Sequence, residues 1–261
     1  MPEMDIGDIS LYYEVSGEGE PLLFIHGLGS STRDWEFQVP EFAKSYRVVT
    51  LDLRGHGQSG KPAGPYSLRL FAEDTARLLQ SLGIESAHVV GLSLGGGVAF
   101  QLAIDYPDLV KTLTIVNSGP FMTGSIETDR QVADERVNIV RQHGMRAMGQ
   151  VLSGRLFPNP EHEPQRNTFV ERWAENDPDA YINATLAMVG WNVSDQISAI
   201  ECPTLVLSAD QDYTPIPVKE AYTKLMPNAE LVVVPDARHA MPIERPEAFN
   251  AALLEFLSKR G

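Results

Sequence analysis

A serine between two glycines is the feature that most constrains the fold of this 261-residue chain. The segment Gly91-Leu92-Ser93-Leu94-Gly95 follows a short apolar run, and residues 98–103 after it have helical apolar spacing. This order predicts a buried strand, a sharp turn at Ser93 and then a helix. Side chains two residues before and two residues after such a strained turn would collide, and glycine at positions 91 and 95 removes them.

The helix expected after Ser93 gives the turn an electrostatic character. Its first N–H groups have no partner within the helix, and its N-terminus carries the positive end of the helix dipole. Negative charge that develops beside Ser93 would therefore be stabilised. For the five residues alone, an ordinary helix start with packing glycines is the alternative, but the strand before and the helix after the motif disfavour it.

Strands and helices alternate through most of the chain. An alternating stretch at residues 4–16 predicts an edge hairpin. Apolar runs typical of strands buried on both faces occur at residues 21–25, 46–52, 110–116, 203–208 and 231–234. Helical spacing separates most of these runs, so the chain is predicted to be an α/β protein with a mostly parallel sheet.

Residues 121–190 interrupt this alternation. They contain no convincing strand and are too long for a bare loop in a compact domain. Helical segments are expected there, around residues 126–143, 145–154, 165–176 and 178–189. We therefore expect residues 1–120 and 191–261 to form one α/β core, and residues 121–190 to form a helical cap.

Several short motifs occur in a fixed order along the chain: His26-Gly27-Leu28-Gly29, the polar turn 52–59, the Ser93 segment, Asp212 and His239. In this order the chain resembles the α/β-hydrolase family over nearly its whole length. The resemblance implies a mostly parallel eight-stranded sheet flanked by helices, with a helical cap inserted after the sixth strand. The charged residues of the polar turn are interpreted as fixing that loop rather than as a catalytic relay.

The resemblance implies that Ser93 is a nucleophile, followed in the chain by an acid and then a histidine. His239 follows the last strand at the strand end where ligands sit in such sheets, and it is the expected base. Asp212 fits the family's spacing for the acid, although Ala209 replaces the usual glycine before it. Asp210 is the alternative acid.

The His-Gly segment implies a second element of the site. In the family this loop supplies one backbone N–H to an oxyanion hole, which corresponds here to Leu28, and the second donor is the N–H of Leu94. Two donors aimed at one oxygen are what a tetrahedral oxyanion requires. A plain glycine turn is the alternative. His26 is expected to anchor the loop by hydrogen bonds rather than to act as a base.

The expected cap would cover the carboxyl ends of the strands and line a substrate pocket. Apolar candidates for its lining are Phe121, Met122, Met148, Met188, Trp191 and Met241. A lining rich in methionine and aromatic residues favours a flexible apolar site. The cap also carries arginines that would suit a carboxylate substrate if they faced the pocket, but a charged outer surface is the simpler explanation for them.

Composition restricts the classes of partner that the chain is expected to bind. The formal net charge of −14 argues against binding to nucleic acid or to an anionic membrane. The single Cys202 permits no intrachain disulfide, and no Cys/His cluster has metal-ligand spacing, so we expect neither a metal nor an organic cofactor. No secretion signal and no apolar run of membrane-spanning length is recognised, which predicts a cytoplasmic protein. A monomer or a homodimer is expected.

These features together predict a serine hydrolase that cleaves carboxylic ester bonds of small, largely apolar substrates. Serine at position 93 argues against the dehalogenases and epoxide hydrolases of the family, which have aspartate there. An enol-lactonase or a C–C bond hydrolase of aromatic catabolism remains an alternative, so the expected partner is a small ester or lactone. A non-catalytic small-molecule-binding protein is the alternative of a different class, against which a complete Ser–Asp–His set argues.

Overall fold

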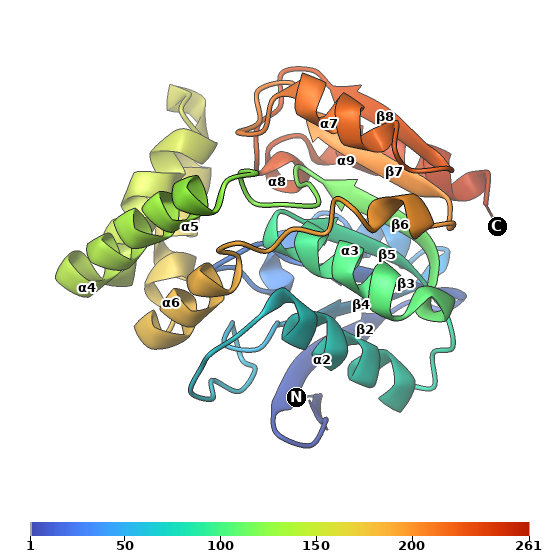
Figure 1. The fold of residues 1–261 in the computed structure, drawn as a ribbon, viewed down its shortest axis with the longest axis horizontal. Helices are drawn as coiled ribbons and strands as arrows, with labels where there is room; N and C mark the ends of the chain where they lie inside the picture. Colours follow the sequence, from blue (N-terminus) through green and yellow to red (C-terminus); the bar gives the residue numbers. More distant parts are fainter. Residues whose placement is uncertain (1, 261) are drawn as a thin grey trace.

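An eight-stranded sheet forms the centre of the computed structural model, which describes residues 2–260 (Figure 1). Strand β2 is antiparallel to both of its neighbours, β1 and β4, and all other adjacent strands are parallel. The predicted mostly parallel eight-stranded sheet is therefore confirmed. In spatial order, the strands are β1 (Glu3–Asp5), β2 (Ser10–Ser16), β4 (Tyr46–Leu51), β3 (Glu20–Ile25), β5 (Ala87–Leu92), β6 (Val110–Val116), β7 (Thr204–Ala209) and β8 (Ala229–Val234).

Helices cover both faces of this sheet because its strands are apolar on both faces. Successive side chains of a strand point to opposite faces, so Leu23 of β3 belongs to one hydrophobic core and Phe24 to the other. The helices α2 (Leu68–Ser81) and α3 (Leu94–Asp105) pack on the first core, and α1 (Val39–Phe42) and α9 (Pro246–Ser258) on the second.

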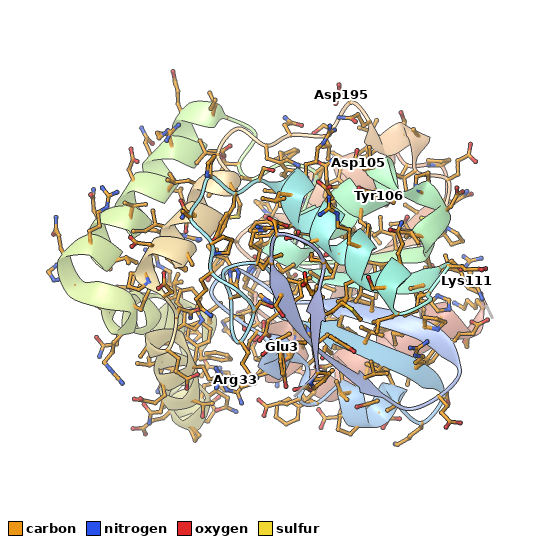
Figure 2. The ribbon with its side chains drawn as sticks, turned by 90° about the horizontal axis from the view of Figure 1, so that it is seen from below. Glu3, Arg33, Asp105, Tyr106, Lys111 and Asp195 are labelled. Atoms are coloured by element: carbon orange, nitrogen blue, oxygen red, sulfur yellow. The ribbon has the colours of Figure 1, made fainter. Side chains whose placement is uncertain are left out.

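The parallel strands end at a common edge of the sheet. Strands β3, β5, β6, β7 and β8 run in the same direction, so the loops after them lie next to one another. These loops contain His26, Ser93, Asn117, Asp212 and His239. Lys111, in the opposite end of β6, lies on the side of the molecule away from this edge (Figure 2).

Three helices follow one another between β6 and β7: α4 (Ile126–Leu156), α5 (Glu163–Ala174) and α6 (Pro178–Ala187). They gather beyond one edge of the sheet (Figure 1). Helix α4 is kinked at Gly144, where φ is 80°, which is the boundary expected between two of the helical segments. The assignment of residues 121–190 to a separate cap stays a prediction. The remaining α-helices are α7 (Ile216–Thr223) and α8 (Met241–Glu244).

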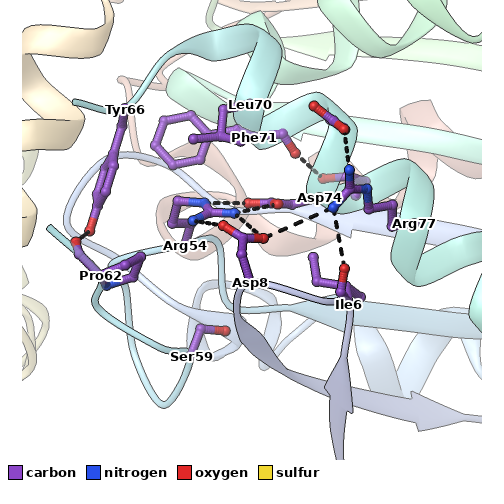
Figure 3. Close-up of polar contacts among 12 residues, drawn as sticks. Ile6, Asp8, Arg54, Ser59, Pro62, Tyr66, Leu70, Phe71, Asp74 and Arg77 are labelled. Atoms are coloured by element: carbon purple, nitrogen blue, oxygen red, sulfur yellow. Dashed lines mark hydrogen bonds and ion pairs between the residues drawn. The ribbon is translucent and has the colours of Figure 1, made fainter. Parts of the chain in front are cut away.

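The polar turn after β4 is held by a buried ion-pair network (Figure 3). Arg54 donates two hydrogen bonds of 2.7 Å to Asp74 of α2, and it also contacts Asp8 at 2.9 Å. The side chains of Arg54 and Asp74 are both buried, and the partly exposed Asp8 accepts two further hydrogen bonds from the guanidinium. This geometry agrees with the interpretation of the turn as a fixed loop.

None of the helices formed by residues 2–260 combines the length and apolar character that a bilayer crossing requires. Within the same residues, no group of three or more His, Cys, Asp or Glu side chains is placed to hold a metal ion.

Candidate active site

Ser93 lies on the strained turn that the sequence predicts. Its φ of 55° and ψ of −116° are unusual for a residue with a side chain, and it precedes the first residue of α3. A Cβ atom on Gly91 would overlap the carbonyl oxygen of Gly95, and one on Gly95 would overlap the carbonyl oxygen of Ile25. Both glycines are therefore required for the backbone to make this turn, which presents the serine side chain at the end of β5.

His239 and Asp212 form a direct pair. The Nδ1 atom of His239 lies 2.6 Å from Oδ1 of Asp212, whose side chain is fully buried. Burial by itself would raise the pKa of Asp212, but His239 and Lys219 outweigh it and hold this pKa below its ordinary value. A charged carboxylate at Nδ1 fixes the tautomer in which Nε2 is free to accept a proton. Asp210 instead accepts a hydrogen bond from the backbone N–H of Ala237.

Further contacts hold the ring of His239 and the backbone of its loop. Tyr213 stacks on it with 4.4 Å between ring centroids and an interplanar angle of 26°. The side-chain amide of Asn117 donates hydrogen bonds of 3.0 Å to the carbonyl oxygens of Arg238 and His239. The amide oxygen of Asn117 accepts the N–H of Ala209 at 2.8 Å. Asn117 therefore ties the end of β7 to the histidine loop.

Ser93 and His239 line the same cavity, whose volume is about 360 Å³. Within residues 2–260 no hydrogen bond joins their side chains, whereas the pair of His239 with Asp212 is already formed. Unbound active sites often have loose contacts of this kind that tighten when substrate binds. The structure thus brings Ser93, Asp212 and His239 to one place. The contact between His239 and Asp212 is formed, and the hydrogen bond between Ser93 and His239 is not.

Four of the six predicted pocket residues line this cavity: Phe121, Met122, Met188 and Trp191. The other two do not, which corrects the prediction for them. Met148 is buried in the core cluster that includes α4, and Met241 is fully buried in the core on the opposite face of the sheet. The sequence positions of these two residues could not reveal which way each side chain points.

A second, smaller cavity of about 70 Å³ adjoins the first at Ser93 and His239. Its other walls include Asp34, Trp173 and Ile243. Ser93 therefore borders both the larger and the smaller cavity.

Two arginines of α4, Arg136 and Arg155, also line the larger cavity. In the part of the chain that the structure describes, neither has a carboxylate within 4.0 Å. Arg146 of the same helix instead pairs with Glu171 at 2.5 Å on an exposed surface. Of these three arginines of α4, Arg146 is therefore neutralised on the outer surface, whereas Arg136 and Arg155 are cations on the cavity wall.

The predicted oxyanion donors also lie at this place, since Leu28 and Leu94 line the same cavity as Ser93. Among residues 2–260, no protein group accepts a hydrogen bond from either backbone N–H. His26 anchors the turn before Leu28: its Nδ1–H donates to the carbonyl of Gly27 at 2.7 Å, and its Nε2 accepts the N–H of Leu53 at 3.0 Å. His26 is fully buried, and this burial lowers its pKa to about 4.

Sequence reasoning missed three residues that hold the site: Asn117, Lys219 and Tyr213. Asn117 carried a weak signal, because asparagine tolerates the positive φ of 45° that it adopts directly after a buried strand. Tyr213 is adjacent to Asp212 in the chain. The only signal for Lys219 was its place as a single cation in α7, and a lysine on a helix is usually exposed to solvent.

The sheet order and the strained serine turn at the strand ends define a hydrolase of the α/β type. Residues 20–136 match the sequence profile of the family described as "alpha/beta hydrolase fold". The chain is 31% identical to the putative carbamate hydrolase RutD of Azorhizobium caulinodans, over 98% of each chain. The protein therefore belongs to the α/β-hydrolase family, whose membership supports a hydrolytic function.

Solved structures agree with this assignment. The enol-lactonase from Burkholderia xenovorans LB400 superposes with a TM-score of 0.91 at 26% identity, covering 98% of this chain and 100% of that one. A thermophilic esterase from Thermogutta terrifontis superposes with a TM-score of 0.87 at 31% identity, covering 96% of this chain and 94% of that one. The fold is therefore shared across relatives with different substrates, and the substrate has to be argued from the site.

Proposed function

We propose that the protein is a serine hydrolase that cleaves carboxylic ester bonds of small substrates through Ser93, His239 and Asp212. The observation that carries this proposal is the contact of His239 with the buried Asp212, together with the position of His239 on the wall of the cavity that Ser93 also lines. A strained serine, an oriented imidazole and two unpaired N–H groups in one cavity are the parts that acyl transfer needs.

In the first half of the reaction, Oγ of Ser93 attacks the ester carbonyl carbon as Nε2 of His239 takes the hydroxyl proton. The charge on the carbonyl oxygen is stabilised by the N–H groups of Leu28 and Leu94. Asp212 stabilises the imidazolium that forms. The C–O bond to the alcohol then breaks, and His239 gives its proton to the leaving oxygen, which releases the alcohol and leaves an acyl group on Ser93.

In the second half, water attacks the acyl carbon and His239 accepts one of its protons. The bond to Oγ of Ser93 breaks, the proton returns from His239 to Oγ, and the free carboxylic acid leaves. Each step moves one proton through one imidazole, so no further acid or base is required from the chain.

The test compares wild type with Ser93→Ala on p-nitrophenyl acetate, butyrate and laurate. We expect turnover of the short esters by wild type and a loss of about a million-fold in kcat in Ser93→Ala if the three residues act as one unit. The butyrate should be preferred over the laurate, because with the nitrophenyl ring in the cavity of about 360 Å³ the adjoining cavity of about 70 Å³ suits a short acyl chain better than a twelve-carbon one.

A Ser93→Ala variant that keeps most of its activity would overturn the mechanism. Absence of turnover by wild type on these three esters and on a simple lactone assayed beside them would favour the C–C bond hydrolase or the non-catalytic binding protein instead.

A second candidate, hydrolysis of an ester or lactone that carries a carboxylate, is favoured by Arg136 and Arg155. Their positive charges face the cavity without a carboxylate partner. In a chain of net charge −14, an anionic substrate needs such local cations to offset long-range repulsion. The similarity in fold to the enol-lactonase from Burkholderia xenovorans LB400 is consistent with this substrate class.

This candidate is tested with a charged and a neutral ester of similar length, the mono-p-nitrophenyl ester of glutarate and p-nitrophenyl butyrate. Replacing Arg136 and Arg155 together by Gln should raise KM for the charged ester by about 10- to 100-fold, the value of a charge-assisted hydrogen bond, and leave the neutral ester nearly unchanged. Arg146→Gln is the matched control, because Arg146 pairs with Glu171 outside the cavity. Equal effects on both esters would contradict a carboxylate site.

A further inference from the structure

Lys219 of α7 has a fully buried side chain in contact with the candidate catalytic acid. Its ammonium nitrogen lies 2.5 Å from Oδ2 of Asp212, and both side chains are completely shielded from solvent. The same nitrogen lies 2.9 Å from Oγ of Ser208 and 3.5 Å from Oδ1 of Asn117. An ammonium has three N–H donors, and these three oxygens can accept all of them. A lysine is almost never buried in this way unless it is paired.

We propose that Lys219 is a positioning residue of the catalytic pair, which fixes the second oxygen of Asp212 and moderates the negative charge that His239 experiences. The proposal rests on the proposed function, in which Asp212 and His239 act with Ser93. It assigns a role to a residue outside the three that carry out the chemistry.

The first part of the proposal follows from the hydrogen-bond partners of Asp212. Oδ1 faces Nδ1 of His239 at 2.6 Å, so the orientation of the carboxylate depends on what holds Oδ2. Apart from Lys219, the group donating to Oδ2 within residues 2–260 is the N–H of Thr214, at the long distance of 3.4 Å. Without Lys219 a buried carboxylate oxygen would lack a strong donor, which is costly and leaves the carboxylate free to rotate.

The second part of the proposal follows from charge. Burial lowers the pKa of Lys219, but Asp212 opposes this effect, and the 2.5 Å contact favours the ammonium–carboxylate form of the pair. A cation directly behind the carboxylate cancels part of the negative potential at the imidazole. Removal of this cation would leave the imidazole beside an uncompensated carboxylate, an environment that favours the imidazolium form.

Other ionisable groups also surround the pair. Arg136 and Arg155 face it from α4, Tyr213 stacks on the imidazole, and Tyr222 donates its hydroxyl to the carbonyl of Ser118. In the histidine loop, Arg238 is paired with Glu244 at 2.8 Å, and Asp210 accepts a backbone N–H. All of these are retained when only Lys219 is changed, so a difference in pH dependence between wild type and variant reports on Lys219.

The test replaces Lys219 by Met, which has a similar length and no charge. We expect the acid limb of the kcat/KM profile for p-nitrophenyl butyrate to move to higher pH by about one unit. At the plateau, kcat should fall about tenfold through misplacement of the imidazole, and KM should change much less. A second readout needs no turnover: the midpoint of the His239 ring titration, followed by NMR on histidine-labelled protein, should move in the same direction.

Ser208→Ala is the matched control, because it removes one contact of the ammonium and keeps its charge. Its acid limb should stay with that of wild type. Lys219→Arg, which also keeps the charge, should return the acid limb toward that of wild type. Lys219→Gln replaces the Met variant if that variant does not fold.

The proposal would be overturned if the acid limb and the His239 midpoint did not move in Lys219→Met or Lys219→Gln and only the melting temperature fell. Lys219 would then be a purely structural residue. Failure of the proposed function would look different. Wild type would then show no Ser93-dependent turnover, while the NMR titration would still report whether Lys219 moderates His239.

Discussion

Asn117 shows how much of this site depends on one residue that carries out no chemistry. Its side chain joins the end of β7 to the carbonyl oxygens of Arg238 and His239, and it is 2% exposed. Because the positive φ of 45° is strained for most residues, the position combines a conformational demand with three hydrogen bonds. Asn117 thereby adds to the hydrogen bonds that Ala237 and His239 make with the segment after β7.

Replacing Asn117 by Ala should lower kcat by about 10- to 100-fold with a small change in KM, because the imidazole loses its fixed place relative to Ser93. The measurement is steady-state kinetics on a short p-nitrophenyl ester. Asn117→Gly is the control, since glycine removes the strain at positive φ but also lacks the amide. A glycine variant as active as wild type would show that the amide does not hold the loop.

For single residues, the sequence predicted the positions of those that belong to a motif, but it did not predict which other residues support the motif. Gly91, Ser93 and Gly95 form one turn, and local sterics alone predict their arrangement. Asn117 and Lys219 act through contacts with residues 92 and 7 positions away in the chain, respectively. The first contact depends on how two strand ends meet, and the second on how α7 packs back on the loop after β7, and no local pattern encodes either.

Among the elements, α4 contributes residues to the wall of the cavity and is kinked at Gly144. Its kink at Gly144 has a φ of 80°, and a Cβ atom there would meet nothing within 4 Å. Gly154 lies further along the same helix, has equally open surroundings and has no positive φ. The two glycines therefore differ in backbone conformation and not in the space around them.

Gly144→Ala should lower the free energy of unfolding by about 1 kcal/mol, because alanine is strained at positive φ. Gly154→Ala should raise it by about 0.5 kcal/mol, because the unfolded chain loses conformational freedom and the helix keeps its shape. Urea unfolding of the two variants and wild type gives both values. Stabilisation by both substitutions would show that α4 does not require the kink.

Helices were easier to predict than the direction in which their side chains point. The helical segments around 126–143 and 145–154 correspond to the two parts of α4 on either side of Gly144. Periodicity could not predict that Met148 lies in the core or that Arg136 and Arg155 line the cavity, because α4 is only weakly amphipathic and packs against both α5 and α6. Such directions depend on tertiary packing.

For the whole molecule, buried ionisable groups predict how stability changes with pH. Burial lowers the pKa of His26 to about 4 and that of His56 to about 3, well below the ordinary value near 6.5. Below pH 6.5 the unfolded chain binds protons that the folded protein does not, so stability falls as the pH decreases toward 4. Burial raises the pKa of Asp34 to about 6, which acts in the opposite direction over part of this range.

The two histidines outweigh the single aspartate, so the free energy of unfolding at pH 5 should be about 2 kcal/mol lower than at pH 7. Urea unfolding at a series of pH values measures this slope. His56→Gln, which removes one of the two titrating rings, should flatten it. A stability that is constant or that increases as the pH is lowered from 7 to 5 would contradict the burial of these rings as neutral groups.

The central claim is that Ser93 is the nucleophile, and covalent labelling tests it most directly. The enzyme is incubated with a p-nitrophenyl alkylphosphonate, which transfers a phosphonyl group to an activated serine, and the modified peptide is identified by mass spectrometry. The account predicts one adduct on Ser93, release of one equivalent of p-nitrophenol and loss of esterase activity, with no adduct in Asp212→Asn on the same timescale. Labelling at another residue, or inactivation without modification of Ser93, would contradict it.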